Sequence, residues 1–130
     1  MRVALDTNVL VRYLVWDDST QSNRAASLIE TAKTLVISTL VLCETVWVLR
    51  RAYKFQASEI VGALRDLTTM PSVEMDRPLV EAGLDILTKG GDFADGVILA
   101  EAKRANADFL ASYDEKLARL SNSVRHLSAT

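Results

Sequence analysis

The hydrophobic and polar positions alternate between short apolar runs and longer segments with helical spacing. The short runs 2–5 and 35–37 end at polar residues that commonly cap helices. In the longer segment 57–67, Ile60 and Leu64 fall on one helical face. The pattern predicts strands at 2–5, 35–37, 73–75, 107–111 and 124–127, a short helix or turn at 9–16, and helices at 24–33, 40–53, 57–67, 77–89, 93–106 and 114–120.

Strands and helices alternate along the whole chain, which indicates the fold class. A β-α-β-α order is typical of a parallel sheet with helices on both faces. The chain has 130 residues, enough for one domain and too few for two ordinary ones. We therefore expect a single domain, residues 1–130, with a three-layer α/β/α architecture around a central parallel sheet.

Composition and charge narrow the class of protein. Hydrophobic residues make up 49% and charged residues 25%, as in soluble globular proteins. The opening MRVALDTNVL has no signal-peptide core, and no run approaches the roughly 20 apolar residues of a membrane helix. We expect a cytoplasmic protein with no membrane association. The net charge of −2 argues against a broadly cationic nucleic-acid-binding surface, so any nucleic acid would be bound at a local site.

The scarcity of cysteine and histidine excludes several kinds of chemistry. Cys43 is the only cysteine and His126 the only histidine of the sequence. An intramolecular disulfide and a multi-cysteine zinc site are therefore impossible. Acid–base chemistry with paired histidines is excluded for the same reason.

Carboxylates follow two of the predicted strands. Asp6 comes directly after the strand 2–5, and Asp114 comes shortly after the strand 107–111. Ligands of open α/β sheets bind beyond the carboxyl ends of the strands, so the two side chains would share one edge of a parallel sheet. Alternatively, each residue only caps the helix that follows.

Glu44 is the only charged residue in the apolar segment 40–49. A buried carboxylate needs a partner, and a bound cation would supply one. The alternatives are a narrow solvated stripe on the helix or an ion pair with Arg51 or Arg12.

Asp92 and Asp95 begin the helix predicted at 93–106 and resemble a capping box with Asp in place of Glu. That structural role explains both residues, although Asp95 is also well placed to face a site at the strand ends. Asp6, Glu44, Asp95 and Asp114 together form a set of oxygen donors that suits Mg²⁺ or Mn²⁺ better than Zn²⁺. Such carboxylate sites commonly hydrolyse phosphodiesters.

The motifs, taken in order, resemble those of PIN-domain nucleases, and in particular of VapC toxins from toxin–antitoxin pairs. The resemblance covers the whole chain and is carried by VALDTNVL at 3–10, Glu44 in its helix, FADGVILA at 93–100 and ASYD at 111–114. It implies a Mg²⁺-dependent endoribonuclease toxin, with Mn²⁺ as a substitute, that acts on RNA, forms a homodimer and is neutralised by a small antitoxin protein.

The resemblance also implies roles for individual residues. Asp6, Glu44 and Asp95 would be the central metal ligands and catalytic residues, with Asp114 as the fourth. Thr7 and Asn8 match residues that orient the first Asp. Asp92 matches an acidic position of many relatives, and Ser112 supplies a hydroxyl near Asp114 where relatives usually have Thr.

Two other functions stay open. A catalytically silent PIN-like module that only binds protein would usually have lost acidic residues, and none is lost here. An Asp-dependent phosphatase needs a second Asp two positions after the first, where this chain has Asn8.

Several basic and aromatic residues have more than one interpretation. The aromatic residues belong either to the core or to a partner groove, and we expect Trp47 in the core. Five basic residues are candidates for phosphate contacts: Arg12, Arg50, Arg51, Lys54 and Lys116. For each of them we favour a solvated position or one that complements a helix dipole. The other aromatic residues in question are Trp16 and Tyr53.

Overall fold

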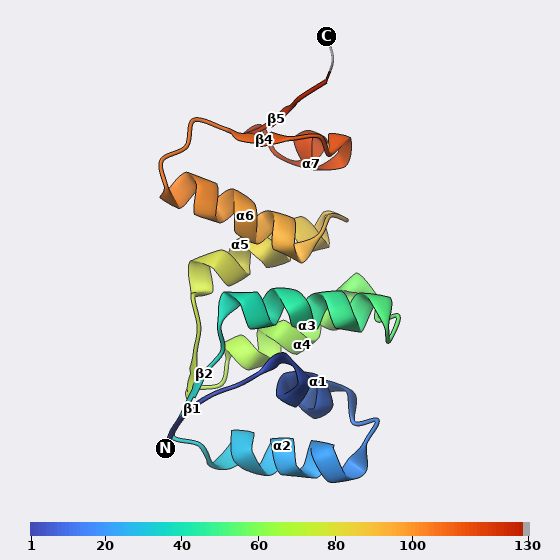
Figure 1. The fold of residues 1–130 in the computed structure, drawn as a ribbon, viewed down its shortest axis with the longest axis vertical. Coiled ribbons are helices and arrows are strands. Elements are labelled where there is room, and N and C mark those ends of the chain that lie inside the picture. Colours follow the sequence, from blue (N-terminus) through green and yellow to red (C-terminus); the bar gives the residue numbers. More distant parts are fainter. Residues whose placement is uncertain (129–130) are drawn as a thin grey trace. The chain divides into compact units, whose positions relative to one another are not determined.

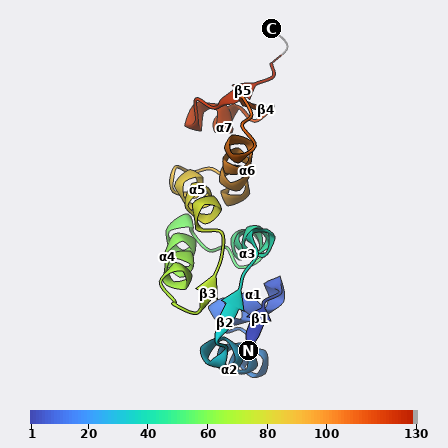
Figure 2. The same cartoon turned by 90° about the vertical axis from the view of Figure 1, so that its left-hand side faces the viewer.

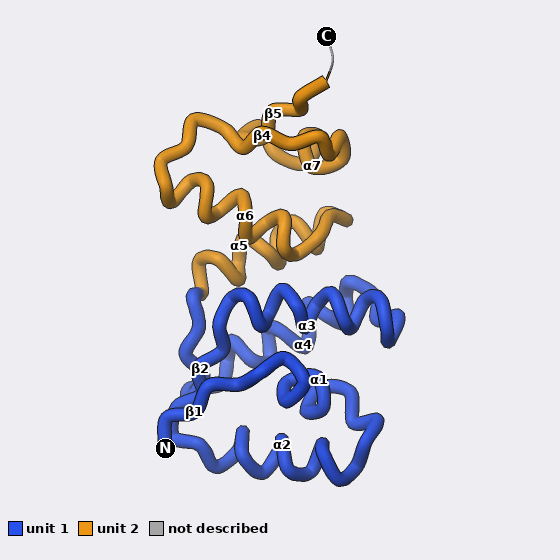
Figure 3. Tube along the Cα trace, viewed as in Figure 1, with its two compact units in different colours: residues 1–76 blue, residues 77–130 orange. Residues whose placement is uncertain are grey.

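The computed structural model describes residues 1–128, in which strands and helices alternate (Figure 1). These residues divide into two compact units, the first ending at Asp76 and the second beginning at Arg77 (Figure 3). The first unit contains β1 (Arg2–Ala4), α1 (Thr7–Val15), α2 (Ser19–Thr31), β2 (Thr34–Val36), α3 (Thr39–Arg51), α4 (Ala57–Thr68) and β3 (Val73–Glu74). The second contains α5 (Arg77–Thr88), α6 (Phe93–Arg104), β4 (Leu110–Ser112), α7 (Glu115–Leu120) and β5 (Val124–His126).

The first unit is built on a parallel three-stranded sheet in the order β1-β2-β3 (Figure 2). Leu35 at the centre of β2 pairs with Val3 on one side and Val73 on the other. Leu35 is fully buried, as are Leu10 of α1 and Leu42 of α3. The apolar strand residues and the apolar helix faces therefore share one core, as the periodicity predicts.

Polar residues between the strands and helices fix where the helices begin. Ser38 caps α3 by accepting a hydrogen bond from the Val41 amide at 3.2 Å. Asp18 caps α2 in the same way, accepting from the Gln21 amide at 3.0 Å. This second cap corrects the sequence prediction, because α2 begins at Ser19 and includes a polar stretch that apolar spacing alone does not mark as helical.

The second unit combines a close helix pair with a parallel two-stranded sheet. Helices α5 and α6 pack together around Phe93, which is 1% exposed. Leu110 of β4 pairs with Val124 of β5. Strand β4 begins at Leu110 and not at residue 107, because the preceding residues complete the end of α6. Asn106 adopts a left-handed conformation there, and the Ala107 amide donates to the Ala102 carbonyl at 3.0 Å.

The α/β class and the parallel pairing predicted from the sequence are confirmed. The described pairs lie in two sheets, one in each unit. Within residues 1–128, every helix is too short or too polar to cross a membrane.

Candidate active site

Two of the predicted site residues, Asp6 and Glu44, lie next to Thr7 in the first unit. Asp6 follows β1 as the N-cap of α1, and its Oδ1 accepts a hydrogen bond from the Thr7 amide at 2.7 Å. The Thr7 hydroxyl donates to Oε1 of Glu44 on α3 at 3.2 Å. Thr7 itself is buried, with 8% exposure. One buried residue thus holds two carboxylates that are far apart in the sequence.

Glu44 is exposed, although its sequence neighbours are apolar. The argument that a buried charge requires a cation is therefore wrong for this residue. Glu44 also does not form the alternative ion pair with Arg12 or Arg51. Arg12 pairs with Asp17, and the Arg51 guanidinium lies over the Trp47 ring, 5.4 Å from its centroid. What recommends Glu44 as a site residue is its bond to Thr7 and not its burial.

The other two predicted carboxylates, Asp95 and Asp114, line a small pocket in the second unit. The pocket has a volume of about 90 Å³, and Asp92 and Lys116 also line it. Burial raises the pKa of Asp95, and the negative charges of Asp92 and Asp114 raise it further. The carboxylates of Asp92 and Asp114 are therefore close enough to Asp95 to affect its protonation.

Asp114 is held in place by two hydrogen bonds. Its backbone amide donates to Ser112 Oγ at 3.0 Å, and its Oδ1 accepts from the Leu117 amide at 3.0 Å. The capping role considered from the sequence is thus present at Asp114, as it is at Asp6. Each cap uses only Oδ1, so capping is compatible with metal binding through the second carboxylate oxygen.

The capping-box arrangement expected at the start of α6 is not formed. Asp92 occupies the N-cap position, but its side chain makes no capping hydrogen bond. Asp92 instead lines the same small pocket as Asp95. Asn8, expected to orient Asp6, is exposed and lines a different pocket between α1 and α2.

The donor chemistry of both carboxylate sets fits a hard divalent cation, because the side chains supply oxygen only. In the part of the chain that the structure describes, no three His, Cys, Asp or Glu side chains form a complete metal-binding group. The structure describes one carboxylate set in each unit, Asp6 with Glu44 in the first and Asp92, Asp95 and Asp114 in the second.

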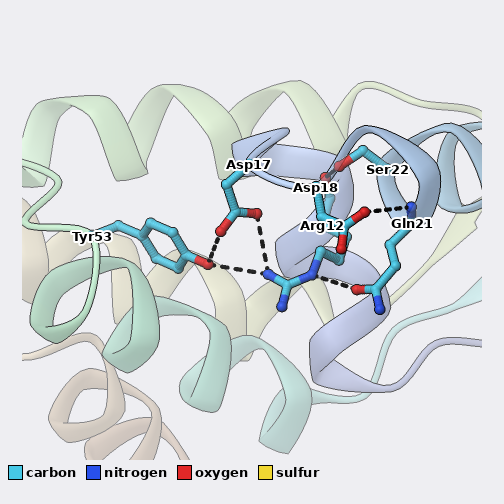
Figure 4. A network of polar contacts seen from close by, with 6 residues as sticks. All are labelled: Arg12, Asp17, Asp18, Gln21, Ser22 and Tyr53. Atoms are coloured by element: carbon cyan, nitrogen blue, oxygen red, sulfur yellow. Dashed lines mark hydrogen bonds and ion pairs between the residues drawn. The ribbon is translucent and has the colours of Figure 1, made fainter.

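A polar network around Arg12 was not predicted from the sequence (Figure 4). Arg12 Nη1 donates to Asp17 Oδ1 at 3.2 Å and contacts the Tyr53 hydroxyl at 3.1 Å, while Nε donates to Gln21 Oε1 at 2.6 Å. Tyr53 in turn donates to Asp17 Oδ2 at 2.7 Å, and this bond, helped by the Arg12 charge, lowers the pKa of Asp17. The available signal was that Arg12 is the only charged residue of α1.

The expectation that Trp47 belongs to the core is wrong, because 61% of the residue is exposed. Leu40, also on α3, is 70% exposed, and Trp16 is 50% exposed. The exposed side of α3 thus carries large apolar side chains beside Glu44.

Several solved structures are similar to the chain, among them two with VapC or VapBC names. One is VapC20 from Mycobacterium tuberculosis, a toxin that cleaves the sarcin–ricin loop. The two sequences are 18% identical, the match covers 90% of this chain and 93% of that chain, and the TM-score is 0.45. The other is VapBC2 from Rickettsia felis bound to a DNA fragment from its promoter, with 20% identity, 97% and 98% coverage, and a TM-score of 0.40. Comparison with curated proteins finds no significant match.

The sequence also matches the family model of the PIN domain over residues 3–122. That match extends through both units and includes all four predicted carboxylates, Asp6, Glu44, Asp95 and Asp114. Because it spans nearly the whole chain, the protein belongs to the PIN-domain family.

Proposed function

We propose that the protein is a Mg²⁺-dependent endoribonuclease that acts as the toxin of a toxin–antitoxin pair. The observation that carries the proposal is that this PIN domain has acidic residues in both units, of which Asp6, Glu44 and Asp114 each accept or make a hydrogen bond that holds them in place. The proposed catalytic and metal-binding residues are Asp6, Glu44, Asp95 and Asp114. The resemblance of the sequence motifs to VapC toxins supports the more specific assignment to RNA cleavage.

The oxygen donors of these residues fit Mg²⁺, with Mn²⁺ as a substitute. A bound divalent cation supplies an activated water for attack on the phosphodiester and stabilises the charge that develops on the leaving oxygen. Burial raises the pKa of Asp95, and the negative charges of Asp92 and Asp114 raise it further; a bound cation would offset that charge.

The chain's own residues position the carboxylates. Thr7 binds Asp6 through its amide and Glu44 through its hydroxyl. Ser112 accepts a hydrogen bond from the Asp114 backbone. The bonds from Thr7 restrict the rotamers of Asp6 and Glu44, and the Leu117 amide restricts that of Asp114, so less order has to be imposed on these exposed groups when a cation and substrate bind. We assign Thr7 and Ser112 to positioning. We also propose that Asn8 and Asp92 support the metal-binding carboxylates without binding the metal themselves.

The proposed partners are RNA as substrate, a small antitoxin protein and a second copy of this chain in a homodimer. The exposed side chains of Leu40 and Trp47 on α3 support a protein interface, because large apolar side chains gathered on a surface commonly mark one. Light scattering of the purified protein should give twice the mass of one chain. A monomer at tens of micromolar would remove the homodimer from the proposal.

The function is tested by incubating the purified protein with single-stranded RNA in metal-free buffer, with Mg²⁺, with Mn²⁺, with Zn²⁺ and with excess EDTA. We expect cleavage with Mg²⁺ or Mn²⁺, little with Zn²⁺ and none with EDTA. Asp95→Asn and Glu44→Gln, purified in the same way, should be inactive, which also excludes a contaminating ribonuclease. Cleavage in EDTA, or by both variants, would refute the carboxylate mechanism, and inactivity of the parent with all metals would favour a silent protein-binding module.

A further inference from the structure

A pocket of about 270 Å³ lies between α1 and α2 in the first unit. Its walls are mostly apolar and include Val9, Ala25 and Leu28. Arg12 and Arg24 also line it, one from each helix. The pocket therefore combines an apolar interior with two positive charges.

The Arg12 side chain lines this pocket and is held in a fixed orientation. Its guanidinium is held by Asp17, Tyr53 and Gln21, and the side chain is only 28% exposed (Figure 4). A guanidinium is planar and stacks on flat rings, and one that is already ordered loses little entropy when it does so. Asp17 balances much of the Arg12 charge, so Arg12 is better suited to stacking and Arg24, which is exposed, to attracting an anion.

The position of the pocket connects it to the proposed catalytic residues. Asn8 lines the pocket and lies two residues after Asp6, in the first turn of the same helix. An RNA strand bound at Asp6 would therefore pass close to the mouth of the pocket.

We propose that the pocket between α1 and α2 binds an unpaired nucleobase of the RNA substrate, with the base over the Arg12 guanidinium and the adjacent phosphate near Arg24. Unpaired RNA bases are commonly recognised by stacking on aromatic rings or guanidinium planes, and their phosphates by basic side chains. The main competitor is an acidic amphipathic helix of a protein partner. Such a helix needs a row of anchoring pockets along a groove, whereas this is one compact pocket beside Asp6.

This inference rests on the proposed function, so its test measures RNA binding separately from cleavage. Leu28→Phe fills the pocket without changing charge, and Arg24→Ala removes the charge without changing the apolar interior. Lys33→Ala is the matched control, because Lys33 is an exposed cation beyond the end of α2 and outside the pocket. Circular dichroism melts establish that each variant folds. The affinity of a fluorescent single-stranded RNA is measured by anisotropy in the inactive Asp95→Asn background, and kcat and KM are measured in the active one.

We expect each pocket variant to weaken RNA binding and raise KM by about tenfold, with kcat almost unchanged. Leu28→Phe removes the space for one stacked base, and Arg24→Ala removes one phosphate contact. Lys33→Ala should bind and cleave like the parent. Unchanged RNA affinity in both folded pocket variants would overturn the inference, and that is also the result expected if the pocket serves a protein partner. If the protein without Asp95→Asn binds RNA but does not cleave it, the proposed function is refuted and the pocket is judged from the affinities alone. If the parent binds no RNA, both the proposed function and the pocket inference are refuted.

Discussion

The hydroxyl of Thr7 on α1 donates a hydrogen bond to the carboxylate of Glu44 on α3, over 3.2 Å. The Thr7 amide binds Asp6 at the same time, over 2.7 Å. Thr7 is buried, whereas both carboxylates are exposed, so the buried residue orders two groups that solvent would otherwise leave mobile. If Asp6 and Glu44 act as proposed, a change at Thr7 should therefore alter activity through these two carboxylates.

Thr7→Val should reduce RNA cleavage about 10- to 100-fold, the range seen when a group that orients metal ligands is lost. Valine has nearly the shape of threonine, so the fold should survive, and the amide bond to Asp6 is kept. The change should appear as a higher Mg²⁺ concentration for half-maximal activity. Thr7→Ser keeps the hydroxyl and should restore most of the activity. If both variants cleave RNA at the same Mg²⁺ concentration as the parent, Thr7 does not position Glu44.

Asp95→Asn should stabilise the metal-free protein at neutral pH. The pKa of Asp95 is raised in the folded state, so the ionised carboxylate costs stability at pH values above its unfolded pKa. Removing the charge should gain at most about 1 kcal/mol, because partial exposure screens the repulsion. The gain should disappear as the pH falls below about 3.9, where the carboxyl is protonated in both states. Urea unfolding of both proteins across this pH range measures the difference.

Glu44→Gln is the matched comparison for that experiment, because Glu44 is exposed and glutamine keeps a hydrogen-bond acceptor for Thr7. Its stability should stay within a few tenths of a kcal/mol of the parent at neutral pH. If Asp95→Asn instead lowers the stability at neutral pH, Asp95 is a structural residue and not part of a repulsive cluster.

Mg²⁺ should raise the melting temperature of the parent, because a ligand that binds only the folded state stabilises it. At a Mg²⁺ concentration 100 times the dissociation constant, the gain is about 2.7 kcal/mol. Asp95→Asn and Asp114→Asn should respond less, since each removes a proposed ligand. An Asp85→Asn control, which alters an exposed acidic residue paired with Lys89, should respond like the parent. An equal shift in all four proteins would indicate nonspecific cation binding.

Tyr53→Phe should destabilise the first unit in a pH-dependent way. The Tyr53 hydroxyl bond is the main cause of the lowered pKa of Asp17, so this interaction stabilises the protein above the unfolded pKa of Asp17. That contribution is lost as the pH falls through the lower folded value. The melting temperature of Tyr53→Phe should therefore be lower than that of the parent at neutral pH, and the two should converge in acid. A constant difference at all pH values would mean that only packing was lost.

The sequence predicts local structure well where one signal dominates. Asp6 follows an apolar strand and precedes a helix, and the structure uses it as an N-cap. The sequence does not reveal the beginning of α2, because its first turns are polar and Asp18 alone marks them. It also misplaces Trp47, because apolar character does not say which face of a helix is covered. The bonds of Arg12 to Asp17 and Tyr53 depend on tertiary packing that spacing along the chain does not encode.

Gly96 follows Asp95 in the motif at 93–100, and the structure gives a packing reason for it. A Cβ atom at this position would lie 2.3 Å from the Ala82 carbonyl oxygen and 2.7 Å from Gly83 Cα, both backbone atoms of α5. Gly96→Ala should therefore force α6 away from α5 and cost at least about 1–3 kcal/mol, as overpacking of a core does. Gly62→Ala on α4 is the matched control, because no heavy atom lies within 4 Å of its added Cβ, and it should gain about 0.5–1 kcal/mol from helix propensity. Urea unfolding of the two variants should shift the midpoint in opposite directions, and equal stability of Gly96→Ala and the parent would show that α5 and α6 do not pack this closely in solution.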